Sequence, residues 1–141
     1  MMMDRTNISV VGSIALDSLE TPNGNREDIL GGSATYFSVA ASKFSPVEVI
    51  GIVGNDFPND CWEVFHSKNI NSKNIIEKHG STFRWGGKYS DDYATRETLF
   101  TELGVFENFK PKIISSSNDQ GILFLANIHP SLQLDVLNKM S

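Results

Sequence analysis

The chain has 141 residues, with 12 Lys and Arg against 17 Asp and Glu, a net charge of −5 and one cysteine. This length suits a single domain, and 9 Phe, 2 Trp and 3 Tyr supply enough bulk for a core to argue against a disordered chain. The acidic balance disfavours nucleic acid as a partner. A lone cysteine excludes an internal disulfide, and no stretch has the length and apolar character of a secretion signal or membrane span. We therefore expect a cytoplasmic protein with no membrane partner.

The first third of the chain predicts a strand, a hairpin and a helix. Residues 8–14 are a β-branched run typical of a buried strand, and residues 15–30 form two extended pieces around a turn that contains Pro and Asn-Gly. A helix is predicted from Ser33, as its cap, to Phe44, and Pro46 would end it. Its apolar residues share one face at spacings of three and four: Ala34, Phe37, Ala40, Ala41 and Phe44.

The middle of the chain continues this alternation. Residues 47–53 are a second β-branched run, and residues 61–67 read as a helix entered through Pro58. Strand, helix, strand, helix is the order that builds a parallel sheet. Residues 67–75 read as a loop rich in Asn and Lys.

The last part of the chain changes rhythm. Residues 82–89 and 95–103 are aromatic and threonine-rich and predict a second hairpin. Residues 121–126 then return to the pattern of a buried strand, and residues 130–140 to that of a helix that begins at a proline.

Glycine sites give no nucleotide-binding fingerprint. Gly12 lacks the glycines that should follow it, and the segment 51–54 has no Lys-Ser/Thr after it, which disfavours a dinucleotide-binding oxidoreductase and a Walker loop alike. Gly31 and Gly32 precede a helix. The two glycines either form a turn and allow close packing, or they allow a ligand to approach the backbone closely, where the free amides of the helix beyond them could bind it.

Two aspartates follow predicted strands. Asp17 comes after the first strand, where open α/β sheets bind ligands, and its carboxylate could accept two hydroxyl hydrogen bonds from a polyol or could be a solvated loop acid. Asp56 is either a helix cap or a ligand contact. The three histidines, at positions 66, 79 and 129, do not have the spacing of metal ligands, so no metal site is predicted. No serine or cysteine lies in a known nucleophile motif, so a hydrolase is not predicted either: His66, His79 and His129 are expected to be structural or exposed.

The second hairpin carries an aromatic and cationic cluster. It could cover a polar ligand or simply pack as the face of a sheet. Its members are Phe83, Arg84, Trp85, Tyr89 and Arg96.

Three segments in order resemble the opening of the ribokinase-like (PfkB) carbohydrate kinases: residues 10–17, 31–41 and 51–56. Residues 123–128 resemble a later strand of the same core. The resemblance implies an α/β fold with a ribokinase-like αβα parallel-sheet core and a small β-sheet lid over the substrate. It further implies that residues 1–141 are the N-terminal part of one such domain, truncated before the C-terminal half, with lid segments near 15–30 and 81–104. In this context the aromatic hairpin is favoured as a cover.

The resemblance also assigns site residues. Asp17 matches the substrate-binding aspartate, and Gly31 and Gly32 match the di-glycine that serves as lid hinge and substrate contact. Tyr36 stands where many members have an asparagine that contacts a hydroxyl, while Arg84 and Asn127 are site residues by position only.

The family's catalytic aspartate lies in a C-terminal Gly-Ala-Gly-Asp segment that this sequence lacks, so no catalytic residue is assigned. The predicted function is ATP-dependent phosphorylation of a hydroxyl of a sugar or nucleoside, with this chain as the substrate-binding N-terminal portion, inactive alone. ATP and Mg²⁺ would serve the complete enzyme and bind poorly to this chain.

The alternative function is a non-catalytic module that binds sugar or dimerises through the lid, and a homodimer through the lid is an open expectation in either case. Because a truncated parallel sheet leaves an open edge and bare apolar faces, we expect the isolated chain to aggregate, stay partly molten or dimerise.

Overall fold

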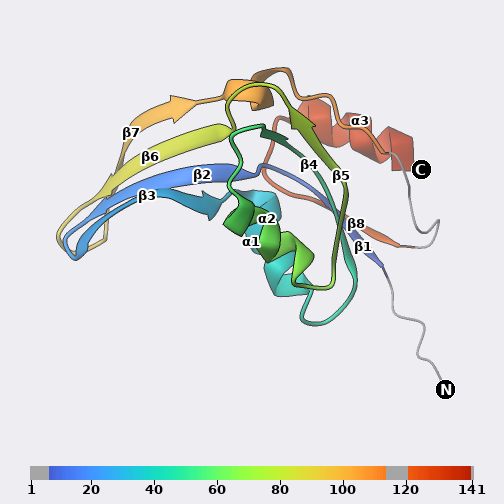
Figure 1. The fold of residues 1–141 in the computed structure, drawn as a ribbon, viewed down its shortest axis with the longest axis horizontal. Coiled ribbons are helices and arrows are strands. Elements are labelled where there is room, and N and C mark those ends of the chain that lie inside the picture. The colour runs from blue at the N-terminus through green and yellow to red at the C-terminus, as the bar shows by residue number, and fades with distance from the viewer. Residues whose placement is uncertain (1–6, 114–120, 141) are drawn as a thin grey trace.

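Two four-stranded sheets form the frame of the computed structural model, which describes residues 7–113 and 121–140 (Figure 1). Sheet A is parallel throughout, in the order β5-β4-β1-β8, from β1 (Ile8–Val11), β4 (Val47–Gly54), β5 (Ile70–Lys78) and β8 (Ile122–Leu125). Sheet B has the order β3-β2-β6-β7, from β2 (Ala15–Thr21), β3 (Gly24–Gly31), β6 (Phe83–Tyr89) and β7 (Arg96–Glu102). Sheet B extends away from sheet A to one side.

Helices cover both faces of sheet A. They are α1 (Ser33–Ala41), α2 (Asn59–His66), α3 (Pro130–Met140) and the short 3₁₀ helix η1 (Gly104–Asn108). Successive residues of a strand point to opposite faces, and Val10 packs in the cluster of α1 and α2 whereas Val11 packs in that of η1 and α3. This three-layer arrangement confirms the predicted αβα core, and sheet B is the predicted second sheet, with four strands like sheet A.

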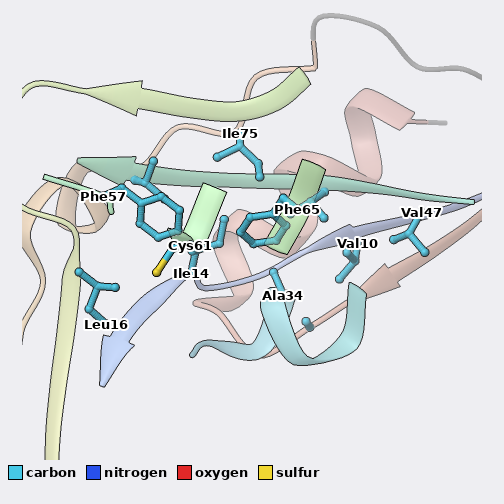
Figure 2. Packing of buried hydrophobic residues seen from close by; sticks show 12 residues of the cluster. Val10, Ile14, Leu16, Ala34, Val47, Phe57, Cys61, Phe65 and Ile75 are labelled. Carbon is cyan, nitrogen blue, oxygen red and sulfur yellow. The ribbon is translucent and has the colours of Figure 1, made fainter. Parts of the chain in front are cut away.

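The larger core lies between sheet A and the helices α1 and α2 (Figure 2). Phe65 of α2 is fully buried among strand residues, and Phe57 meets the ring of Trp62 edge to face at 5.2 Å. Each such side chain contributes about 1.5–3 kcal/mol by leaving water. In α2, Asp60 Oδ1 also accepts a hydrogen bond from the Cys61 amide (3.0 Å), so an acidic residue supports the first turn.

Several predicted boundaries are wrong. The first strand ends at Val11, three residues early, and α1 ends at Ala41 because the amides of Ser42 and Phe44 bond back to Ser38 O and Ala41 O and close the helix. The capping residue is Gly32, not Ser33.

The predicted apolar face of α1 is also wrong toward its end. Phe44 is 85% exposed and Ala40 is exposed, whereas the residues buried against the sheet are small: Ala34, Thr35 and Ser38.

The predicted loop at residues 67–75 is largely strand β5, which pairs in parallel with β4. Its polar composition hides a buried side: the Asn74 side chain is fully buried and donates to Glu48 Oε1, and Ser9 Oγ donates to Glu48 Oε2 at 3.2 Å. A polar cluster that is satisfied within the sheet therefore takes the place of the apolar alternation that usually marks a strand.

The prediction of a buried last strand is wrong as well. Ile122 and Phe124 of β8 are 56% and 43% exposed, because in the described residues β8 pairs on one side only, with β1. The helix predicted over residues 130–140 is α3.

Both hairpins are confirmed, and they join each other. β2 pairs with β3 and β6 with β7 in antiparallel fashion, while β2 and β6 lie side by side in parallel from Ala15↔Phe83 to Glu20↔Lys88. Residues far apart in sequence thus build one sheet. No helix in the described ranges combines the length and apolarity needed to cross a membrane.

Candidate functional site

The two sheets meet where the link from β1 to β2 crosses the link from β3 to α1. Two serines tie these links together, since the Ser13 amide donates to Ser33 Oγ (3.1 Å) and the Ser33 amide donates to Ser13 Oγ (3.0 Å). A Cβ on Gly12 would lie 2.6 Å from Ser33 Oγ, so only glycine allows the links to approach this closely. The crossing is a fixed reference point between sheet B and the core.

This crossing also decides the role of the first amides of α1. The Ser33 amide bonds to Ser13 Oγ and the Ala34 amide to Ser13 O, each at 3.0 Å. These two helix amides are therefore taken by the protein, and the expectation that the helix start offers them to a ligand is wrong for both.

Asp17 lies beside the crossing as the third residue of β2. A Cβ on Gly31 would overlap Asp17 Oδ2, so the absence of a side chain at Gly31 makes room for the carboxylate. Among the described residues nothing donates a hydrogen bond to this carboxylate and no cation pairs with it, and burial raises the pKa of Asp17 above its ordinary value. Asp17 is a half-buried acid with free acceptor capacity.

Gly32 follows directly and caps α1 with φ 99°. Any side chain here would be strained, and its Cβ would overlap Ser13 O. Asp17, Gly31 and Gly32 are thus brought together, as the sequence predicts, although their role toward a ligand stays a prediction.

Two other predicted site residues, Asn127 and Tyr36, have exposed side chains and form no hydrogen bond with Asp17 in the described residues. Asn127 follows β8, and its carbonyl oxygen accepts a hydrogen bond from Ser33 Oγ (3.1 Å), which places it on the α1 side of the crossing with its own side chain exposed. Tyr36 is an exposed residue of α1 and makes no side-chain contact with Asp17 in the described part of the chain.

The aromatic cluster divides into two parts. Phe83 stacks on Phe106 of η1 at 5.2 Å and belongs to the packed interior. Trp85 pairs in register with Asp17 on the neighbouring strand, so the two side chains share a face of sheet B, and the Arg96 guanidinium lies 4.9 Å above the indole. The end of the Trp85 ring lies against Gly87 on its own strand, so the ring extends along β6 away from Asp17.

Arg84 points elsewhere. Its Nη1 donates to Asp56 Oδ2 (2.7 Å) and its Nε to Asp28 Oδ1 (3.1 Å). Asp56 also accepts hydrogen bonds from the amide and hydroxyl of Thr82, at 2.8 and 2.7 Å, so it neither caps α2 nor stands free for a ligand. Burial alone would raise the pKa of Asp56, but the bonds from Arg84 and Thr82 and the Arg84 charge outweigh it and lower that pKa.

Sequence reasoning missed Ser13, Asp28 and Thr82. Each is a polar residue in a turn or strand, and its importance depends on a partner 20 to 56 positions away. The signal available for Ser13 was its place directly after Gly12 at the end of a strand.

The residues that hold a metal ion in proteins do not gather in the described ranges, where no three of His, Cys, Asp and Glu come together.

The parallel αβα core and the side sheet built from two hairpins match the ribokinase-like fold. Neither a protein-family model nor a curated protein matches the chain. Among solved structures, the Methanocaldococcus jannaschii nucleoside kinase, an archaeal member of the ribokinase family, is 22% identical with a TM-score of 0.76, and the match covers 95% of this chain and 48% of that one.

Two further structures are similar at lower identity. The ribokinase of Cryptococcus neoformans var. grubii serotype A in complex with ADP is 16% identical, with a TM-score of 0.68 over 87% of this chain and 41% of that one. The Burkholderia thailandensis nucleoside kinase in complex with inosine is 15% identical, with a TM-score of 0.60 over 69% and 37%. The chain spans about half the length of the first of these structures and less of the others, and the likeness establishes its fold.

Proposed function

We propose that this chain is the acceptor-binding and lid-bearing portion of an ATP-dependent kinase that phosphorylates a hydroxyl of a sugar or nucleoside. The observation that carries this proposal is the Asp17 carboxylate, which is half-buried at the glycine crossing and has no donor among the described residues. The similarity in fold to sugar and nucleoside kinases supports it.

The chemistry of Asp17 suits an acceptor with neighbouring hydroxyls. An ionised carboxylate in a partly dry setting is costly unless donors reach it. Two hydroxyl groups of a sugar ring would supply them, and Trp85, which lies on the same side of sheet B, would border the ring. In this proposal Asp17 binds and orients the acceptor, Gly31 leaves room for the carboxylate, and sheet B is the lid.

ATP and Mg²⁺ belong to this proposal only for the complete enzyme. When bound there, they would supply the phosphoryl group and the charge that stabilises its transfer. In this proposal the chain contributes the binding of the acceptor, and the described residues contain no cluster of three His, Cys, Asp or Glu that would add a metal site.

Titration calorimetry of the folded chain against pentoses, hexoses and nucleosides tests the proposal. We expect at least one compound to bind, and Asp17→Asn to weaken its binding about tenfold or more, since a charged carboxylate accepts hydrogen bonds from hydroxyl groups that a neutral amide replaces poorly. Glu20→Gln is the matched control, because Glu20 is an exposed acid on the same strand. Binding that survives Asp17→Asn, or no binding by a cooperatively folded chain, contradicts the proposal.

A second candidate is a non-catalytic module that associates through sheet B. It is favoured by β7, which is exposed along its whole length and carries Leu99 and Phe100 in the open. Sedimentation velocity distinguishes the two: Leu99→Lys would dissociate a dimer formed through sheet B, whereas a chain that is monomeric without the substitution rules this module out.

A further inference from the structure

Arg84 joins three elements of the molecule through one guanidinium group. It lies on β6 of sheet B, bonds to Asp28 on β3 of the same sheet, and bonds to Asp56 in the turn after β4 of sheet A. Its shorter ion pair, 2.7 Å to Asp56, is the one that crosses from sheet B to the core. This cross-sheet bond resists rotation of sheet B against the core.

The turn that contains Asp56 is also bonded to residues 80–82, the link that leads into β6. Thr82 is fully buried, and its hydroxyl accepts a hydrogen bond from the Gly54 amide (2.9 Å) while donating to Asp56 Oδ1. A neighbouring bond from the Gly80 amide to Asn55 Oδ1 (2.9 Å) fixes the same turn. Asp56 is therefore an extension of the end of β4, and Arg84 is anchored to sheet A through it.

The sheet B side of the bond is looser and lies next to the candidate site. β3 bulges opposite Ser18, where Asp28 adopts φ 51° and its amide bonds to Ser18 Oγ (3.4 Å). The Asp28 side chain is 52% exposed against 33% for Asp56, so solvent screens its pair with Arg84 more strongly. Ile29, the next residue, is the register partner of Asp17.

We propose that Arg84 is a positioning residue: its bond to Asp56 sets the inclination of sheet B over the carboxyl end of sheet A, and with it the place of Asp17 relative to α1. Arg84 then acts through the sheet and does not touch the acceptor. The consequence for ligand binding rests on the proposed function, whereas the geometric claim stands on the bonds of Arg84 alone.

Spin labels on the full chain test the geometric claim. Asp91→Cys places a label in the exposed turn between β6 and β7, and Lys68→Cys places one on the core beyond α2. Cys61 is buried and the pKa of its thiol is raised to about 11, so it stays largely unlabelled because the thiolate is the reactive form. Pulsed dipolar spectroscopy then measures the distance distribution between sheet B and the core.

For the labels at positions 91 and 68 we expect one narrow distribution of distances. Arg84→Met should widen this distance distribution at least twofold. Asp56→Asn should widen it comparably and Asp28→Asn less, since the exposed pair is the weaker one. Arg26→Met is the matched control, an exposed arginine on β3 with no ion pair in the described residues. Each variant is first shown to unfold cooperatively. An unchanged distribution in folded Arg84→Met overturns the proposal.

Calorimetry separates this claim from the proposed function. If no sugar or nucleoside binds the unaltered chain, the proposed function fails and the distance measurement alone decides the role of Arg84. If a compound binds, we expect Arg84→Met to weaken its affinity about tenfold and Arg26→Met to leave it unchanged. Full affinity in Arg84→Met with a widened distribution would show that sheet inclination does not position Asp17, and would overturn the proposal.

Discussion

The Asp17 carboxylate is half-buried beside the crossing of the two links, where its charge is costly to the protein. Because burial raises its folded-state pKa above the ordinary value of 3.8, the folded chain holds the proton more tightly than the unfolded chain. The charge of Asp17 therefore lowers stability at neutral pH. This penalty shrinks as the pH falls through the raised pKa and disappears below the unfolded value, where both states are protonated.

We accordingly expect Asp17→Asn to raise the urea midpoint of unfolding at pH 7 and to lose this advantage near pH 3, while it weakens the binding of the acceptor. Unfolding curves at the two pH values measure the effect, with Glu20→Gln as the control for loss of one surface charge. A variant less stable than the unaltered chain at pH 7 would mean that the Asp17 charge is stabilised by the fold.

The Asp17 carboxylate occupies the space that a side chain at Gly31 would need. Gly31→Ala adds a Cβ that overlaps Asp17 Oδ2, and we expect a cost of about 1–3 kcal/mol as the crowded strands adjust. In an Asp17→Ala background the overlapping atom is gone, so the same substitution should cost much less. A double-mutant cycle from denaturant unfolding measures the coupling, and equal costs in both backgrounds would place the crowding elsewhere.

At the scale of residues, the sequence predicted that Asp17, Gly31 and Gly32 lie close together, because the order and spacing of the motifs are visible in the sequence. It could not predict what holds Arg84. The partners of Arg84 come from β3 and from the turn after β4, and only the register of β6 beside β2 brings them together.

At the scale of elements, β5 shows how a polar strand can occupy a parallel sheet. Asn74 and Glu48 face each other across β5 and β4, and burial, only partly offset by the hydrogen bond from Ser9, raises the pKa of Glu48. The strand escapes pattern-based prediction because its buried side is an amide paired with a carboxyl group. The hairpins were predictable, since their turns and aromatic runs are local signals.

Asn74→Asp tests this cluster by setting a second acid against Glu48. We expect a loss of several kcal/mol at pH 7, about 3–5 by analogy with other uncompensated buried charges, and a smaller loss at pH 4, where a proton can be shared. Asn108→Asp is the control for the same change of side chain, since Asn108 is an exposed residue of η1, outside sheet A. Equal losses at the two pH values would exclude repulsion between the acids as the cause.

At the scale of the whole molecule, apolar side chains remain open at one end of the three layers. Ile122 and Phe124 on β8 and Leu134 and Leu137 on α3 are all exposed, and Phe124 stacks only on Phe37 of α1 at 4.0 Å. β8 offers an uncharged edge with nothing paired to its outer side in the described residues. Such an edge favours association between copies.

We therefore expect concentration-dependent association of the chain in sedimentation velocity at micromolar concentrations. The paired substitutions Ile122→Lys and Leu134→Lys should reduce it, because charges on an edge oppose strand addition. Leu99→Lys, on sheet B, is the comparison that separates this edge from association through sheet B. A monodisperse monomer of the unaltered chain would contradict the expectation.

The parallel contact between β2 and β6 has a consequence for the order of folding. Its partners, such as Leu16 and Arg84, are separated by β3, α1, β4, α2 and β5. Bringing them together closes a long loop, whose entropic cost is met only after the intervening segment has become compact. Sheet B should thus be among the last parts to acquire protection from hydrogen exchange during refolding, and the ligand-facing surface would exist only once the αβα layers have formed.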